Sequence, residues 1–481
     1  MPGPGRGGRR DGDDHGHTGN VSLLHGWLPW AVQAAAAAVL LAGTGWRNRT
    51  WRMRLVPLVL AVGAAGTGAA MLAVQTTVRE PLPASFWIWV GACLCAAGVA
   101  ALGWRGARWW RRTVAALAVV LTALAAGVRL NEFVGYYPTV GDALADLRGQ
   151  PLPGQVNVAQ LPAVGGGVRA GRLVTVDIPD TASHFRHRQE LVYLPPVWFN
   201  AVKRPKLPVL EMIGGEYAEP TNWVRAGNAV QTADVFAAQH GGWAPILVFV
   251  DATGGFRVDT ECVNGLAGPA QDHLTKDIPP FVAATFGASP DPRNWGVVGW
   301  SMGGTCAITL AVTHPEVFDH FEDISGDLGP NIGDRASTIA KLYGGNAAAW
   351  AANDPLTVMR AHGPYRNVSG WFEQGDAEAS HIRQANQLAA AAARVGILTH
   401  EQQRPGKHDW QLGSAAFADA LPWLAQQLGL PGVTPTPPAV PPSAVPPAAH
   451  GRTVLGQPAG PDARPPGALR PPIARPHLRR F

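Results

Sequence analysis

The stretch Trp295-Gly-Val-Val-Gly-Trp-Ser-Met-Gly-Gly304, continued by Thr-Cys-Ala-Ile-Thr-Leu310, decides the fold. Its apolar start at Trp295–Val298 is typical of a strand that is buried on both faces. The small and apolar residues after Ser301 are typical of a helix that packs closely on a sheet. Only glycine fits at Gly299 and Gly303 if the chain turns sharply between the two elements. The stretch therefore predicts a strand, a tight turn that projects the Ser301 hydroxyl, and a helix.

Short β-rich runs alternate with longer helical patterns on both sides of this unit, over residues 171–430. The predicted strands are Leu173–Ile178, Glu190–Leu194, Pro208–Met212, Pro245–Val250, Trp295–Val298, Phe321–Ile324, Gly370–Glu373 and Thr399–Gln403. Helices are predicted near 230–239, 277–286, 303–313, 379–395 and 414–428. Strands that alternate with helices need crossover connections, so we expect an α/β domain with a mostly parallel sheet.

Residues 27–130 have the composition of a membrane region. The whole chain is 47% hydrophobic and only 15% charged, whereas about a quarter of a soluble domain is charged. Four uncharged apolar stretches follow one another: Trp27–Thr44, Leu55–Val74, Ala84–Trp104 and Thr113–Val128. A span needs about 20 residues, with about 17 as the lower limit, so the first and fourth stretches are short. We predict four transmembrane helices, because a buried hairpin would need more surrounding protein.

Charge is unevenly distributed along the chain. Residues 1–130 carry 13 arginines against 4 acids, residues 131–430 carry 20 basic against 29 acidic groups, and residues 431–481 carry 6 arginines against 1 aspartate. The high pI of 9.2 would favour nucleic acid binding. The only block long enough for a large globular fold is acidic, which argues against a nucleic acid partner.

Arginine also predicts the orientation in the membrane. The loops after the first and third spans each hold four arginines, and the loop after the second holds only Arg79. Loops rich in arginine remain in the cytoplasm. The N-terminus and everything after residue 130 are therefore expected outside the cytoplasm.

Three segments are predicted to lack a core of their own. Residues 1–26 are expected to be a disordered N-terminus and residues 131–170 a linker. Residues 431–481 hold 15 prolines and 6 arginines, which predicts a disordered tail. An extracytoplasmic basic tail could contact anionic cell-wall polymers, or it could be inert.

Gly299-Trp-Ser-Met-Gly303 matches the Gly-x-Ser-x-Gly elbow that presents a nucleophilic serine. A serine needs a base and a group that orients the base, in the order serine, acid, histidine. His408 lies in the polar loop Pro405–Trp410 between the last strand and the last helix, where a general base would be held. The turn Glu373-Gln-Gly-Asp-Ala-Glu378 offers Asp376 and Glu378 beyond its strand, and spacing alone leaves the choice open.

The same turn predicts how an oxyanion would be held. The Met302 N–H lies at a helix N-terminus, where it can receive the oxyanion of a tetrahedral intermediate. A second donor is expected in the loop Ile213-Gly-Gly-Glu-Tyr217, unless this is a plain glycine turn. No metal or organic cofactor is implied. Outside the cytoplasm Cys262 and Cys306 could form a disulfide or remain free thiols.

Over residues 170–430 the sequence resembles the esterase D family of α/β-hydrolases, which includes the secreted mycolyltransferases. The resemblance is carried by Gly299–Gly304, His314-Pro-Glu-Val-Phe318, Trp350-Ala-Ala-Asn-Asp-Pro355 and His408-Asp-Trp410. The resemblance implies an α/β-hydrolase fold. The acid of the family follows a Gly-x-x-acidic pattern, which implies Glu378, with Asp376 as the alternative. It also implies that the backbone N–H of Glu216 is the second oxyanion donor.

These patterns predict a membrane-anchored, extracytoplasmic serine esterase or acyltransferase. Ser301 would attack, His408 would act as the base, and Glu378 would orient His408. The substrate would be a carboxylic ester or an acyl group of a cell-envelope lipid, and membrane lipids would be partners. The alternative is a non-catalytic cell-surface binding or assembly protein on a hydrolase scaffold. A transporter is disfavoured because the spans hold almost no ionisable residues.

Overall fold

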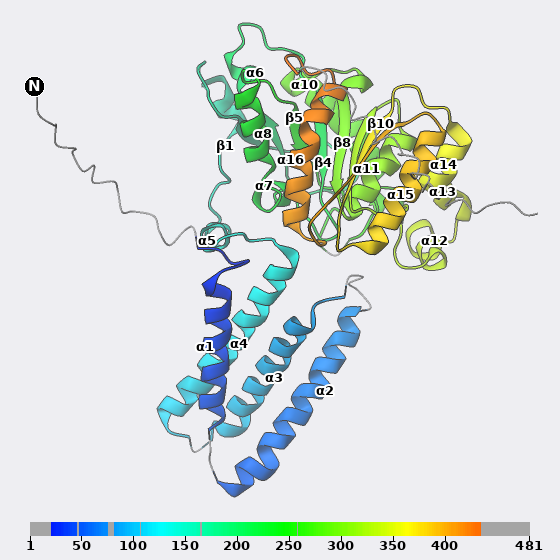
Figure 1. Ribbon diagram of the computed structural model, residues 1–481. Helices are drawn as coiled ribbons and strands as arrows, with labels where there is room; N and C mark the ends of the chain where they lie inside the picture. Colours follow the sequence, from blue (N-terminus) through cyan, green and yellow to red (C-terminus); the bar gives the residue numbers. More distant parts are fainter. Residues whose placement is uncertain are drawn as a thin grey trace, which may run out of the picture. The chain divides into compact units, whose positions relative to one another are not determined.

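The computed structural model describes residues 21–45, 48–75, 81–105, 107–163, 166–256 and 258–433 (Figure 1). The predicted tail therefore lies outside the described residues from position 434 onward, as do residues 1–20. Residues 21–26 were expected to be disordered, but the chain here is held by backbone pairing. The Leu23 N–H donates to the Pro138 carbonyl at 2.9 Å, and the Val140 N–H donates to the Val21 carbonyl at 3.0 Å.

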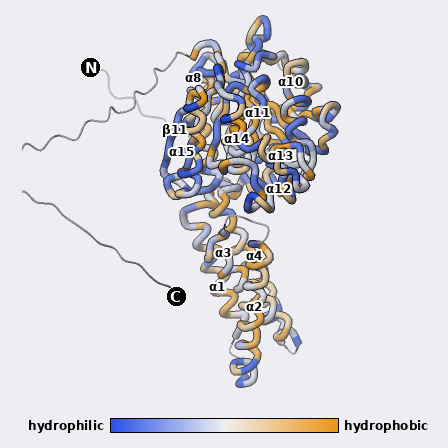
Figure 2. Tube along the Cα trace, turned by 90° about the vertical axis from the view of Figure 1, so that its right-hand side faces the viewer, coloured by the Kyte–Doolittle hydropathy of each residue, from blue (hydrophilic) through white to orange (hydrophobic). Residues whose placement is uncertain are grey.

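Four helices are long and apolar enough to cross a membrane. They are α1 (Trp27–Thr44), α2 (Val56–Gln75), α3 (Ala84–Gly103) and α4 (Trp109–Val134), and a π-helical turn at Trp51–Leu55 leads into α2. Helix α4 packs against both α1 and α3, and α2 packs against α3 (Figure 1). Hydrophobic residues run along all four helices (Figure 2). Many of them face outward, as expected of helices whose solvent is lipid.

The expectation that the fourth span is short is wrong. Helix α4 has 26 residues, because the helix continues beyond the apolar stretch at both ends. The turns at Trp109–Arg112 and Arg129–Val134 are helical, although they contain polar residues and lie outside the apolar stretch Thr113–Val128. The length of the apolar stretch therefore underestimates the length of the helix where polar turns extend it.

A sheet of nine strands forms the second part of the structure, in the order β1-β2-β3-β5-β4-β8-β9-β10-β11. Only β3 runs antiparallel to its neighbours β2 and β5. This mostly parallel order, with the exchange of β4 and β5, is the α/β-hydrolase fold. The strands are β1 (Gln155–Val156), β2 (Arg172–Val176), β3 (Glu190–Leu194), β4 (Val209–Ile213), β5 (Ile246–Phe249), β8 (Trp295–Trp300), β9 (His320–Ile324), β10 (Ser369–Gly375) and β11 (Leu398–Arg404).

The central strands are buried along their whole length, so helices must cover both faces of the sheet. Every residue of β4, β8, β9 and β10 is buried. Helix α8 (Ala229–Gln239) packs beside α16 (Trp410–Gln427). In a second group, α11 (Met302–Thr313) packs against α14 (Pro355–His362), which packs against α15 (Ala379–Arg394) (Figure 1).

Several elements were not predicted. The expected linker contains α5 (Val140–Leu147), which begins with a capping box between Thr139 and Asp142, and the two-residue strand β1. Short helices have weak periodicity, and their caps are the stronger signal. The other elements without a predicted counterpart are α6 (Pro196–Asn200), α7 (Asn222–Arg225), β6 (Asn264–Gly265), β7 (Gly268–Pro269), α9 (Ala270–Asp272), α12 (Arg335–Tyr343) and α13 (Ala347–Ala351). Helix α10 (Ile278–Phe286) corresponds to the helix predicted near 277–286.

Candidate active site

Ser301 lies on a strained turn between β8 and α11. Its φ is 60°, which is uncommon for a residue with a side chain. The turn is so close that a Cβ on Gly299 would collide with the Gly303 carbonyl, and one on Gly303 with the Ile213 carbonyl. The Ser301 N–H donates to the Ile324 carbonyl at 2.8 Å. The backbone therefore holds the hydroxyl clear of the sheet at the N-terminus of a helix.

The structure brings Ser301, His408 and Glu378 together. The Nε2 atom of His408 lies 2.9 Å from Ser301 Oγ. The Nδ1 atom of the same ring lies 2.6 Å from Glu378 Oε1. The three residues come from the ends of β8, β10 and β11, which meet at one edge of a parallel sheet. An imidazole placed between a hydroxyl and a carboxylate is the arrangement that activates a serine.

The Glu378 carboxylate is held in its ionised form by several donors. The Ser325 hydroxyl and the Gly375 N–H donate to Oε2 at 2.8 and 2.7 Å, and His381 Nδ1 lies 3.4 Å from Oε1. Burial raises the pKa of Glu378, but hydrogen bonds from His381, His408 and Ser325 outweigh burial and hold it well below the ordinary value. A charged carboxylate can therefore fix the orientation of the His408 ring.

The alternative acid, Asp376, lies in the same turn and has another partner. Its Oδ1 accepts a hydrogen bond from the Gly406 N–H at 3.1 Å. This contact joins the turn after β10 to the loop that carries His408. The geometry therefore gives Asp376 a contact with the loop backbone, and it gives Glu378 the contact with the imidazole.

Two neighbours of the site, Ser325 and His381, were not found from the sequence. Ser325 follows β9 and donates to Glu378. The His381 ring stacks on the His408 ring with centroids 4.9 Å apart. His381 lies three residues after Glu378 at the start of α15, and this i to i+3 spacing was the signal that could have found it. Ser325 had no local signal, because only the sheet brings β9 beside β10.

The expected oxyanion donors lie beside Ser301. Met302 is the first residue of α11, where a backbone N–H has no acceptor within the helix. The loop after β4 passes close to the serine: a Cβ built on Gly215 would lie 3.3 Å from the Ser301 Cβ. Glu216 follows in this loop and lines the same cavity as Ser301 and Met302. Both backbone segments are thus close enough to serve a single oxyanion.

A cavity of about 630 Å³ opens above Ser301. From the α/β-hydrolase domain it is lined by the reacting groups and by aromatic side chains such as Trp300, Tyr217 and Trp410. Four apolar side chains from the end of α4 and the residues just before α3 complete it: Leu82, Leu130, Phe133 and Val134. The site can therefore receive a substrate with a substantial apolar part.

Cys262 and Cys306 form a disulfide that ties the loop before β6 to α11. Cys306 lies five residues after Ser301 in the sequence, on the helix that begins at the nucleophile. The bond restrains the helix whose N-terminus faces the cavity.

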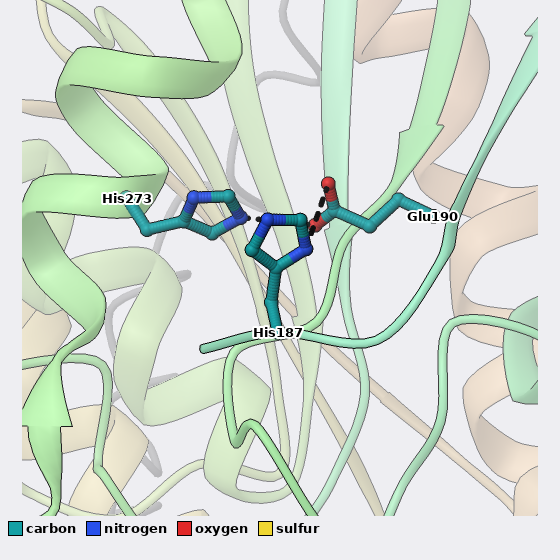
Figure 3. Close-up of side chains that lie close together, drawn as sticks. All are labelled: His187, Glu190 and His273. Atoms are coloured by element: carbon teal, nitrogen blue, oxygen red, sulfur yellow. Dashed lines mark hydrogen bonds and ion pairs between the residues drawn. The ribbon is translucent and has the colours of Figure 1, made fainter. Parts of the chain in front are cut away.

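A second group of histidines and carboxylates lies in the core, and the sequence did not point to it. Figure 3 shows the rings of His187 and His273 beside the Glu190 carboxylate. His273 bridges Glu190 Oε1 and Asp277 Oδ2, each at 3.2 Å. The two ring nitrogens of His187 lie 2.9 Å from the carbonyls of Arg188 and Ile178. Burial lowers the pKa of His273, but Glu190 and Asp277 outweigh burial and raise it. This group is an internal ion-pair network.

In two groups of described residues, ring nitrogens and carboxylate oxygens lie within 4.8 Å of one another, as a metal site would need. They are the group of Glu378, His381 and His408 and the group of His187, Glu190 and His273. In the first group, both nitrogens of His408 already contact Ser301 and Glu378. In the second, the nitrogens of both histidines contact carbonyls or carboxylates. The ring nitrogens of His187, His273 and His408 are therefore already in contact with other protein atoms.

The chain is similar to several known proteins. An uncharacterized protein of Corynebacterium glutamicum is 29% identical over 416 residues, which cover 83% of this chain and 95% of that protein. The S-formylglutathione hydrolase of Paracoccus denitrificans is 26% identical, over 50% of this chain and 88% of its own. The diacylglycerol acyltransferase/mycolyltransferase Ag85A of Mycobacterium ulcerans is 33% identical, but over only 32% of this chain and 54% of that protein.

The comparison of structures and the family profile address the α/β domain. A solved ferulic acid esterase aligns with a TM-score of 0.44 at 20% identity, covering 54% of this chain and 99% of its own. Residues 183–424 match the family described as "Putative esterase". The chain therefore belongs to this esterase family, and it is an α/β-hydrolase of the serine esterase and acyltransferase class.

Proposed function

We propose that the protein is a membrane-anchored serine esterase or acyltransferase whose catalytic residues are Ser301, His408 and Glu378. The observation that carries the proposal is the continuous line of contacts from Ser301 Oγ through the His408 ring to Glu378. This line ends at a cavity large enough for an ester. A non-catalytic scaffold would have no need to keep a strained serine within 2.9 Å of an imidazole.

The reaction follows from this geometry. Ser301 Oγ attacks the carbonyl carbon of the ester while His408 Nε2 takes the hydroxyl proton. The Glu378 carboxylate stabilises the imidazolium, and the N–H groups of Met302 and Glu216 stabilise the oxyanion. When the intermediate collapses, the C–O bond to the alcohol breaks and His408 gives the proton to the leaving oxygen. The acyl group then remains on Ser301.

The second half of the reaction releases the acyl group. A hydroxyl attacks the acyl carbonyl, His408 takes the proton of that hydroxyl, and Ser301 leaves with the proton returned to its oxygen. Water as the attacking group gives hydrolysis, and an alcohol gives acyl transfer. Both outcomes use the same acyl-enzyme and the same residues.

We place the α/β domain outside the cytoplasm. Helices α1 to α4 are long and apolar enough to span a membrane. The arginine-rich loops after α1 and α3 favour the cytoplasmic side. Trp27 and Trp30 lie at the opposite end of the span from Trp104 and Trp109, as expected of side chains at the two interfaces.

Labelling with a fluorophosphonate tests the catalytic proposal. The purified full chain should react with the probe, and the modified peptide should contain Ser301. Prior heat denaturation should abolish labelling, because the denatured chain has no base beside the serine. Modification of a different serine, or no modification of the folded chain, would contradict the proposal and favour a binding protein.

Reporter fusions test the location. Alkaline phosphatase fused after residue 170 should be active, and the same reporter fused after Arg49 should be inactive, because this phosphatase matures only outside the cytoplasm. The opposite pattern would place the hydrolase domain in the cytoplasm.

A further inference from the structure

The active-site cavity has two walls of different origin. The α/β domain supplies the reacting groups, and the membrane region supplies Leu82, Leu130, Phe133 and Val134. Leu82 lies in the connection between α2 and α3, and the other three lie in the last two turns of α4. All four side chains are apolar, so they offer hydrophobic contact to a ligand.

The end of α4 is held beside the loop that carries His408. The Lys407 ammonium donates to the Glu132 carbonyl at 2.9 Å, and the Gln411 side-chain amide donates to the Gly135 carbonyl at 2.9 Å. Gly135 has a φ of 76°, and a Cβ at this position would collide with the Gln411 side chain. Glycine therefore permits both the turn that ends α4 and the close approach to α16.

The residues after α4 reinforce this attachment. The Tyr136 hydroxyl lies 3.1 Å from Asn222 Oδ1, and Arg225 pairs with Asp146 at 2.9 Å. Val134 and Tyr136 pack against the main hydrophobic core of the α/β domain. The membrane helix thus continues into the domain through specific contacts, and its last turns are a fixed part of the cavity.

The apolar wall lies near the expected level of the membrane surface. Arg129 on α4 stacks its guanidinium over Trp30 of α1 at 5.2 Å from the ring centroid. Tryptophan is enriched at both membrane interfaces, and a long arginine side chain near the end of a spanning helix can extend to the interface. Leu130 and Phe133 follow Arg129 by one and four residues, or about 1.5 and 6 Å along a helix. A chain that leaves the outer leaflet would therefore meet these side chains first.

We propose that the end of α4 and Leu82, just before α3, form the acyl-chain wall of the active site, and that the ester enters this site from the outer leaflet. The ligand is a long-chain acyl ester whose chain lies against Leu82, Leu130 and Phe133 while its carbonyl reaches Ser301. This inference rests on the proposed function, because the carbonyl must reach a nucleophile. Each methylene removed from water favours binding by about fourfold, so such a wall selects for chain length.

Matched tryptophan substitutions on α4 test this wall. Leu130→Trp fills the cavity, whereas Leu124→Trp makes the same change on the same helix at a side chain that is 50% exposed and does not line the cavity. The full chain is placed in nanodiscs of phosphatidylcholine and phosphatidylglycerol. The measured quantity is the ratio of kcat/KM for p-nitrophenyl palmitate to that for p-nitrophenyl butyrate.

We expect Leu130→Trp to lower the palmitate-to-butyrate ratio about 16-fold, the equivalent of two methylene groups at about fourfold each, and Leu124→Trp to leave it at the wild-type value. Leu82→Trp changes a different segment of the same wall and should lower the ratio in the same direction, which guards against a folding defect in Leu130→Trp. Fluorophosphonate labelling of Ser301 in each variant shows that the domain is folded.

If Leu130→Trp and Leu82→Trp label at Ser301 but keep the wild-type ratio, the proposed function stands, but the proposal of an acyl-chain wall is wrong. An equal fall in Leu124→Trp would overturn it too, because the effect would then come from the bilayer and not from the cavity. If the wild-type chain neither hydrolyses butyrate nor labels at Ser301, the proposed function fails, and the wall fails with it.

Discussion

Two clusters in this protein are built from the same residue types and have different surroundings. Glu378 with His381 and His408, and Glu190 with His187 and His273, both bring two histidines and a carboxylate within 4.8 Å. His408 extends one ring nitrogen to the Ser301 hydroxyl at the floor of a cavity. His273 has both nitrogens bound by carboxylates in the core. A histidine with one nitrogen facing a cavity is placed to act as a base, whereas one with both nitrogens bound by carboxylates stabilises the core.

The largest expected effect is the loss of the nucleophile. Ser301→Ala should lower kcat for p-nitrophenyl butyrate by about 10⁶-fold, because the remaining groups supply only binding and oxyanion stabilisation. Thermal unfolding should change little, since the substitution removes one hydroxyl at a cavity floor. Ser337→Ala on α12 is the control and should keep wild-type turnover. Equal turnover by wild type and Ser301→Ala would show that Ser301 is not the nucleophile, and the cluster of His408 would then have no catalytic role to distinguish it from the cluster of His273.

The second effect separates the two carboxylates of the turn after β10. Glu378→Gln should lower kcat by about 10⁴-fold, because the amide no longer holds the His408 ring in the tautomer that accepts a proton from serine. Asp376→Asn should stay within a few-fold of wild type, since the Asp376 carboxylate accepts a hydrogen bond from the Gly406 backbone and not from the His408 ring. Steady-state kinetics of the two variants decide the matter. A severe loss in Asp376→Asn alone would reverse the assignment.

The third effect should appear in stability and not in chemistry. His273→Leu removes the cation between Glu190 and Asp277 and should cost about 3–5 kcal/mol in the free energy of unfolding, because two carboxylates are left buried without it. Urea unfolding measures this cost. His314→Leu is the matched control: His314 pairs with the exposed Glu316, and surface changes stay within about 0.5 kcal/mol. A catalytic loss in folded His273→Leu would show that the second cluster also serves the reaction.

The smallest effect is the pH dependence of stability. The folded state raises the pKa of His273, so its contribution is complete below the unfolded pKa of about 6.5 and is lost as pH rises through the folded pKa. The facing groups are Glu190, Asp277 and the His187 ring. Urea unfolding between pH 6 and 9 should therefore show a decrease in stability that His273→Leu lacks. The same decrease in both proteins would assign it to another group.

Local sequence was sufficient for the parts of the fold that repeat a pattern. The α/β-hydrolase class follows from alternating strands and helices, because buried parallel strands must be apolar on both faces. The glycines around Ser301 predicted the turn for the same reason that the structure needs them, since a side chain at either position would collide with backbone. Short helices such as α5 were not predicted, because they contain too few residues to show a clear periodicity and depend on caps and packing for their stability.

The site was predictable where chain order and turns restrict the choice, and unpredictable where separate strands meet. Ser301 and His408 follow strand ends and could be named. The Ser325 hydroxyl donates to Glu378, which lies 53 positions later in the sequence. The sequence around either residue contains no pattern that predicts this contact. The core cluster escaped for a related reason, because Glu190 and His273 are 83 positions apart.

The amino-acid sequence was sufficient to predict four long apolar stretches, an α/β-hydrolase domain and a serine on a sharp turn. These properties depend on composition, periodicity and steric exclusion within a few residues. The folded structure was needed to show which carboxylate contacts His408, which histidines lie in the core, and that the end of α4 lines the cavity. Such choices depend on contacts between distant segments, and the sheet and core packing that make those contacts leave no local mark in the sequence.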